Sequence, residues 1–250
     1  EKLVASFPGD AAAVLGLSVS HERLGDLARA SGDPATAVGH YKKRLALMER
    51  LARADPGRPD WQRELAISHE KIGEIASASG DLVVAGEHFE QRLAITTALV
   101  AHDPLNARWR SDQATSLEKL GKVRFAAGDL AAARGHFEKA LTIAQSLVSE
   151  DPANTETQHG LAAVHSKLAD VASAMRDPAG RRTHLEKTLA IVEDLAAKDR
   201  RNMEWQVDLS TTCCMLAETE ATSGNRPAAL RLGERSLAVA EAVVAILGQR

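Results

Sequence analysis

The sequence predicts an all-α fold: an α-α superhelix in which antiparallel helix hairpins stack as a right-handed solenoid. Three observations support this prediction. The chain repeats with a period of 48 residues, apolar residues recur at helical spacing within each repeat, and 44% of the residues are hydrophobic but only 3% aromatic. So few aromatic residues disfavour a β-sandwich or barrel. Tandem hairpins, in contrast, bury their apolar faces by stacking on one another.

Turn signals mark the same point in every repeat. Each is a dipeptide suited to end one helix and begin the next, usually glycine followed by aspartate. They stand 48 residues apart and are Gly32-Asp33, Gly80-Asp81, Gly128-Asp129, Arg176-Asp177 and Gly224-Asn225. A fixed period of this kind is typical of repeat architectures, so we expect one elongated array.

The second repeat shows how each helix is specified. Apolar residues recur at helical spacing on both sides of Gly80, which predicts a first helix over residues 59–79 and a second over 81–102. Gly80 can end the first helix in the left-handed conformation, and Asp81 can cap the second. Pro104 cannot continue that second helix. Each repeat is therefore predicted to be one antiparallel hairpin.

Five repeats follow a short leading segment. Residues 1–8 align with the end of a second helix, so we expect them to be the tail of a preceding, truncated repeat. The five repeats are 9–56, 57–104, 105–152, 153–200 and 201–250, and together they are predicted to form one solenoid domain. The fourth and fifth repeats are degenerate. Arg181 takes the place of an alanine in the fourth, and Gly233 takes the place of an aromatic residue in the fifth.

Composition and charge narrow the range of functions. A formal net charge of -3 without a basic tract gives no field that would attract nucleic acid. No apolar run has the length of a membrane span, and no secretory leader is recognised, so we expect no membrane partner. The two cysteines, Cys213 and Cys214, are neighbours in sequence and would form only a strained disulfide, which favours a reducing, cytoplasmic location.

A second motif recurs in the first three repeats. It consists of a hydrophobic residue and glycine in the first helix, alanine and an aromatic residue four positions later in the second helix, and a proline after it. In the first repeat these are Leu24-Gly25, Ala37, Tyr41 and Pro56; in the second they are Ile72-Gly73, Ala85, Phe89 and Pro104. The pattern resembles the tetratricopeptide repeat. Because that repeat has 34 residues, the longer unit here implies about two extra turns in each helix.

The resemblance implies that the first helices line a concave groove in which a partner lies. That face would carry Glu22, Asp26, Glu70, Glu74, Glu118, Lys122 and Asp170. Because most of these residues are acidic, we expect a protein or peptide partner of basic or mixed charge. Arg181, a charge at a packed position, is a second candidate contact.

An alternative reading of the acidic rows remains open. Arg23, Lys71 and Lys167 each lie three residues before an acidic residue of the second row. Pairs at this spacing are neighbours on a helix surface and stabilise it by roughly 0.2 to 0.5 kcal/mol each. In that case the rows are ordinary solvated helix surface.

Histidine and tryptophan also fall into columns. His21, His69 and His165 lie on first helices, and His40, His88, His136 and His184 lie on second helices. Equivalent residues of adjacent repeats are about 10 Å apart, too far to share a metal ion, so we expect packing histidines and no metal site. Trp61, Trp109 and Trp205 are predicted to plug the core between repeats rather than to stack on a partner.

These observations predict a binding protein. The sequence contains no catalytic constellation and no phosphate-binding loop, so we expect neither enzymatic activity nor a cofactor. The predicted function is a scaffold that binds a protein or peptide in the first-helix groove. The alternative is a sensor or autoinhibitory arm of a larger signalling protein. The apolar C-terminal helix, which lacks the polar face of a capping unit, also predicts self-association through that end.

Overall fold

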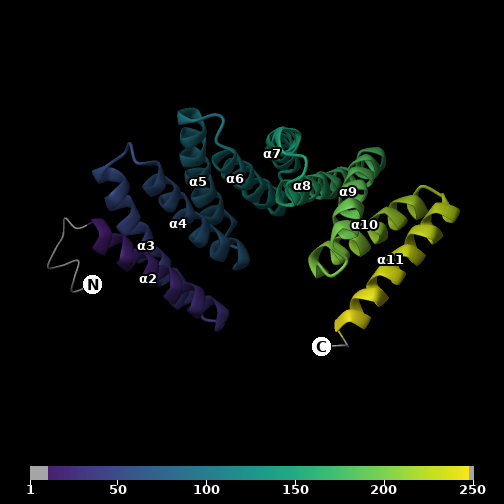
Figure 1. Cartoon of the computed structure of the whole chain (residues 1–250), viewed down its shortest axis with the longest axis horizontal. Helices are drawn as coiled ribbons and strands as arrows, with labels where there is room; N and C mark the ends of the chain where they lie inside the picture. Colours follow the sequence, from purple (N-terminus) through teal and green to yellow (C-terminus); the bar gives the residue numbers. More distant parts are fainter. Residues whose placement is uncertain (1–10, 248–250) are drawn as a thin grey trace. The chain divides into compact units, whose positions relative to one another are not determined.

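The computed structural model describes residues 11–247, and the predicted tail over residues 1–8 lies outside the described residues. All ten elements of the described part are helices (Figure 1). The first helices of the hairpins are α2 (Ala11–Ala30), α4 (Pro59–Ala78), α6 (Ala107–Ala126), α8 (Thr155–Ala174) and α10 (Met203–Thr222). The second helices are α3 (Pro34–Ala54), α5 (Leu82–His102), α7 (Leu130–Glu150), α9 (Pro178–Lys198) and α11 (Arg226–Leu247). The predicted all-α fold is confirmed.

The chain divides into two compact units, Glu1–Gly128 and Asp129–Arg250. Within the first unit, α2, α3, α4 and α5 each pack against the next helix along the chain. The second unit has the same order of packing from α7 to α11. Short turns join the helices, so consecutive helices run antiparallel and each unit is a row of stacked hairpins.

The turns have the conformations that the residue types predict. Gly80 has a φ of +83°, the left-handed region that glycine adopts without strain. The Asp81 carboxylate then accepts a hydrogen bond from the backbone N–H of Val84 at 3.1 Å and caps α5. Both predictions for this turn are confirmed. In the fourth repeat Arg176 takes the glycine position and has a φ of 58°.

The two helices of each of the first two hairpins approach closely at a glycine of the first helix. A Cβ atom placed on Gly25 would lie 2.5 Å from Cε1 of Tyr41, and one on Gly73 would lie 2.7 Å from Cε1 of Phe89. Both aromatic rings are buried. The glycines are therefore required because the ring of the second helix lies directly on the backbone of the first.

Neighbouring hairpins are joined by a leucine of the second helix. Leu45 of α3 packs against a cluster formed by residues of α3 and α4 that includes Ile72 and Ile75, and Leu93 of α5 packs against the cluster that includes Leu120 and Val123 of α6. In the second unit, Leu189 of α9 packs against the cluster of Ala169, Leu185 and Leu216, which joins α8, α9 and α10. These three leucines stand at the same position of their repeats, so similar packing recurs within both units.

Candidate functional site

A buried arginine organises the first-helix face of the first unit. The side chain of Arg44, on α3, has no exposed surface and lies between α2 and α4. Its guanidinium contacts the carboxylate of Glu22 at 3.2 Å and that of Glu64 at 2.6 Å. It also donates to the Glu64 carbonyl at 2.9 Å and to the hydroxyl of Ser68. A buried charge needs this number of partners to offset its lost hydration.

A lysine continues the same network to the next row. Nζ of Lys71, on α4, lies 2.8 Å from Oδ1 of Asp26 and 3.9 Å from Oε1 of Glu22, both on α2. The Tyr41 hydroxyl donates to the same Asp26 oxygen at 2.6 Å. Glu22 and Asp26 therefore lie close together on α2, but both are paired with cations of other helices.

The network repeats one hairpin later. Arg92 of α5 contacts Glu70 of α4 at 3.1 Å and donates to the Ser116 hydroxyl of α6. Nζ of Lys119, on α6, lies 2.9 Å from Glu70 and 2.5 Å from Glu74. Two acidic residues and two cations thus form the same cluster at successive levels of the first unit.

The pKa values follow from burial and charge together. Burial alone would raise the pKa of Glu70, but the charges of Arg92 and Lys119 and their hydrogen bonds lower it overall. The pKa of Asp26 is lowered in the same way, because the hydrogen bonds from Lys71 and Tyr41 outweigh its burial. The pKa of Lys119 is raised, since Glu70 and Glu74 outweigh the effect of burial. Both charge types are therefore ionised at neutral pH.

The other predicted residues lie on separate helices. Glu118, half-buried, and Lys122, exposed, lie one turn apart on α6. Asp170 accepts from Lys167 at 3.0 Å within α8, so the intrahelical alternative is confirmed at this pair. Arg181 of α9 contacts Glu218 of α10 at 3.3 Å, so the charge at this packed position has a partner in the next helix.

Sequence reasoning missed the two buried arginines. Arg44 and Arg92 are one 48-residue period apart, and each precedes the leucine that joins neighbouring hairpins. Spacing within one helix pairs each lysine only with acidic residues of its own helix. Lys71 and Lys119 instead contact the residues 45 positions earlier, Asp26 and Glu74. That spacing is one period less three residues, so the pattern was visible in the sequence.

The two histidine columns meet inside the hairpins. His21 lies against His40, His69 against His88, and His165 against His184, each with 3.0 Å between the Nδ1 atoms. Burial and then the neighbouring histidine lower the pKa of His69 to about 4, and the same two effects, in the same order, lower that of His165 to about 4. Both histidines are therefore neutral at physiological pH, and the prediction of packing histidines is confirmed. In residues 11–247 no three His, Cys, Asp or Glu side chains gather as a metal site would require.

Tryptophan is confirmed as a core residue at two positions. Trp61 packs on the cluster of Val14, Met48 and Leu51, and Trp205 packs on the cluster around Cys213. The guanidinium of Arg58 also stacks over the Trp61 ring at 4.5 Å. None of the helices in the described part has the length and apolar composition that a membrane span requires.

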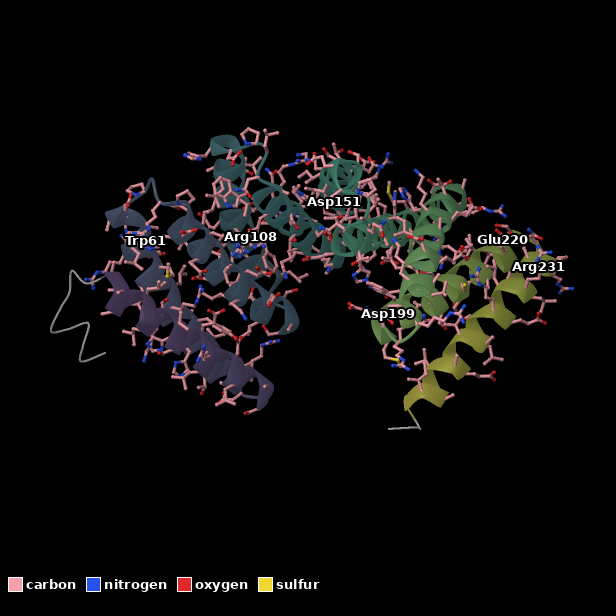
Figure 2. The ribbon with its side chains drawn as sticks, in the orientation of Figure 1. Trp61, Arg108, Asp151, Asp199, Glu220 and Arg231 are labelled. Atoms are coloured by element: carbon pink, nitrogen blue, oxygen red, sulfur yellow. The ribbon has the colours of Figure 1, made fainter. Side chains whose placement is uncertain are left out.

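A charged cavity of about 350 Å³ lies among α9, α10 and α11 of the second unit. Glu220 is buried near the end of α10, and Arg231 lies on the adjacent α11 (Figure 2). Glu220 is paired with Arg182 and accepts a hydrogen bond from Asn225 at 2.6 Å. Arg235, at the same cavity, is paired with Glu193. Because these partners belong to the chain itself, the cavity is best explained as an internal ion-pair network.

Comparisons with known proteins agree with this architecture. The family model of the tetratricopeptide repeat matches residues 112–194. A search of curated proteins finds no match. Three solved structures have similar folds at low identity, as follows.

The crystal structure of BtubC (BKLC) from P. vanneervenii is 21% identical, with a TM-score of 0.74 over 96% of this chain and 85% of that one. A putative kinesin light chain from Podosopora anserina with nearly identical TPR-like repeats is 22% identical, with a TM-score of 0.60 over 88% and 93%. The apo form of RapI is 15% identical, with a TM-score of 0.66 over 87% of this chain and 52% of RapI. Residues 112–194 thus match the tetratricopeptide repeat model, and these solved structures share the fold of stacked helix hairpins described above.

Proposed function

We propose that the chain is a scaffold that binds a protein or peptide, without catalysis, along the face formed by α2, α4 and α6. Repeat arrays commonly use such extended surfaces to bind their partners. The observation that carries the proposal is the repeated cluster of carboxylates and cations on this face. The side chains of Asp26 and Glu74 are each 39% exposed, although Lys71 and Lys119 already contact them. Their outer oxygen atoms can therefore still accept hydrogen bonds.

The pairing of the carboxylates supports a partner of mixed charge. A strongly basic segment would compete with Lys71 and Lys119 for the same carboxylates. A segment of mixed charge can instead place a lysine or arginine on Asp26 or Glu74 while one of its own carboxylates lies near Lys71 or Lys119. Of the two partner types that the sequence allowed, the structure therefore favours the mixed-charge one. The role of sensor or autoinhibitory arm stays a prediction.

A displayed library of random peptides, selected against the whole chain, tests this proposal. Enriched peptides are assayed against the double variant Asp26→Lys, Glu74→Lys and against the control Glu87→Lys, which changes an exposed glutamate of α5. We expect mixed-charge sequences that bind the unmodified chain and the control but lose at least tenfold in affinity for the double variant. Circular dichroism establishes that all three proteins are equally helical.

Two results would contradict the proposal. If no peptide is enriched, or if the enriched peptides bind the double variant as well as the control, this face is not the binding site. Its ion pairs would then serve only to join neighbouring hairpins.

A further inference from the structure

A cavity of about 450 Å³ lies between the start of α4 and the second half of α5. Pro56, Pro59 and Gln62 line it from the turn before α4 and from α4 itself, and Ile95 and Leu99 line it from α5. Leu99 is buried, so the cavity has an apolar floor. The whole site belongs to the first unit and lies away from both ends of the described chain.

The lining of this cavity is uncharged and mostly apolar. Among the described residues that line it there is no aspartate, glutamate, lysine or arginine. Gln62 supplies the main polar group. Its Nε2 donates to the Pro56 carbonyl at 3.3 Å, while its Oε1 accepts no hydrogen bond from the described part of the chain. Such a lining does not offset the lost hydration of an ion, so it favours a neutral ligand that donates one hydrogen bond.

The fourth repeat has the same floor but a different rim. Five lining residues recur there unchanged: Pro56, Gln62, Ala94, Ile95 and Leu99 correspond to Pro152, Gln158, Ala190, Ile191 and Leu195. At the rim, Asp194 and Lys198 replace Ala98 and His102. Nζ of Lys198 lies 2.6 Å from the Asp194 carboxylate and donates to the Gln158 side chain of α8 at 3.0 Å. The lysine therefore bridges α9 and α8 at the rim.

The second repeat lacks this bridge. Ala98 has no group that could hold a cation, and the His102 ring packs edge-on against Trp109 of α6 with 6.0 Å between the ring centroids. Gln62 bonds to the Pro56 carbonyl instead of to a residue of α5. The opening in the second hairpin therefore follows from two residue types at its rim.

We propose that this cavity binds a small uncharged molecule that has an aromatic ring and one hydrogen-bond donor. The prolines of the turn and the aliphatic side chains of α5 form two apolar walls that a flat ring can contact together. Oε1 of Gln62 is the acceptor for the donor. The cavity volume lies within the range of roughly 300 to 1,000 Å³ that is typical of small-molecule sites. No residue of the ion-pair clusters lines the cavity, so this proposal is independent of the peptide-binding face.

Methyl NMR of the whole chain with labelled isoleucine, titrated with indole as the probe, tests the proposal. Ile95 reports on the cavity, and Ile191 reports on the corresponding position of the fourth repeat. We expect indole to shift the Ile95 signal in a saturable manner and to leave Ile191 unchanged. N-methylindole, which has no N–H to donate, should bind roughly three- to tenfold more weakly.

Exchanging the two rim residues between the repeats gives a closed and an opened variant. The closed variant, Ala98→Asp with His102→Lys, copies a pair that a folded hairpin of this chain already carries. It should weaken indole binding at Ile95 by about tenfold or more, because the bridge occupies space that the ring needs. The opened variant, Asp194→Ala with Lys198→His, should produce an indole-dependent shift of Ile191.

A control variant carries the same aspartate–lysine pair outside the cavity. Glu87→Asp with Gln91→Lys changes two exposed positions of α5 and should bind indole as the unmodified chain does. Circular dichroism establishes that the closed, opened and control variants are equally helical.

Other outcomes overturn the proposal. An Ile95 signal that does not shift in the unmodified chain up to the solubility limit of indole shows that the cavity does not take this class of molecule. Equal binding by the closed variant and the control places indole elsewhere, and an opened variant without a shift of Ile191 shows that the rim residues do not control access. Equal affinity for N-methylindole removes the role of Gln62. Tighter binding of N-acetyltryptophanamide than of indole would assign the cavity to a tryptophan side chain of a protein partner instead.

Discussion

Replacing His69 by leucine is expected to weaken the dependence of the chain's stability on acid. His69 is buried, and its Nδ1 lies 3.0 Å from Nδ1 of His88. One ring must donate the hydrogen bond that the other accepts, so the pair is stable in the neutral form. The third repeat has leucine at the corresponding position, Leu117, which is buried in α6. Leucine is therefore compatible with this position in a folded hairpin.

The size of the effect follows from the pKa of His69. Burial and then the charge of His88 lower it from 6.5 to about 4. Because the folded pKa lies below the unfolded value, the unfolded chain binds more protons below pH 6.5, and stability falls as the pH falls from 6.5 towards 4. Between about pH 7 and about pH 5 this histidine costs roughly 2 kcal/mol of unfolding free energy. His165, with its pKa lowered to about 4, costs a similar amount.

Urea unfolding, followed by circular dichroism at these two pH values, measures the loss directly. We expect His69→Leu to reduce the acid-induced loss by roughly 2 kcal/mol relative to the unmodified chain. The control is His102→Leu, at an exposed histidine of α5, which should leave the loss unchanged. The lowered pKa values of Asp26 and Glu70 do not interfere, since stability from these carboxylates is lost only at lower pH. An equal acid-induced loss in His69→Leu and in the unmodified chain would refute the reasoning.

Three further substitutions test the packing, each by its urea midpoint. Gly73→Ala should destabilise the folded chain by roughly 1 to 3 kcal/mol, because the Cβ of the alanine would lie 2.7 Å from Cε1 of Phe89. The control Gly135→Ala, at a glycine with open space around it, should instead stabilise the chain. Equal effects of the two substitutions would contradict the close approach at Gly73. Arg92→Met should cost roughly 3 to 5 kcal/mol, because it removes the more deeply buried of the two cations that pair with Glu70; a loss below about 1 kcal/mol would contradict that role. Arg176→Gly should stabilise by about 1 kcal/mol, because glycine adopts the φ of 58° without strain, and a loss of stability would show that the Arg176 side chain matters more than its backbone.

The hairpins were predictable because their signals are local. Gly80 and Asp81 end one helix and cap the next through contacts within a few residues, so each residue type indicates its role. Gly25 and Gly73 and the aromatic residues that pack on them stand at fixed positions of the repeat, so the sequence shows both as parts of one motif. Glu22 and Asp26 do share one cluster, and the role of the first-helix face in binding a partner stays a prediction.

The partners of those acidic residues were not predicted. A count of charges along one helix suggested an acidic surface, but Arg44 reaches Glu22 from the second helix of the same hairpin. Lys71 reaches Asp26 from the next hairpin. These contacts depend on how each helix is rotated about its axis against its neighbour. Side-chain spacing within a single helix does not contain that rotation.

The sequence by itself determined the all-α class, the helix ends and the small residues at the close approaches, because turn chemistry and helical periodicity act over a few residues. Only the tertiary structure decided which charges neutralise one another and that the two histidine columns meet in pairs. Those properties arise when helices distant in sequence come into contact. Two opposite charges form an ion pair only when their atoms come within about 3 Å, and otherwise each stays solvated.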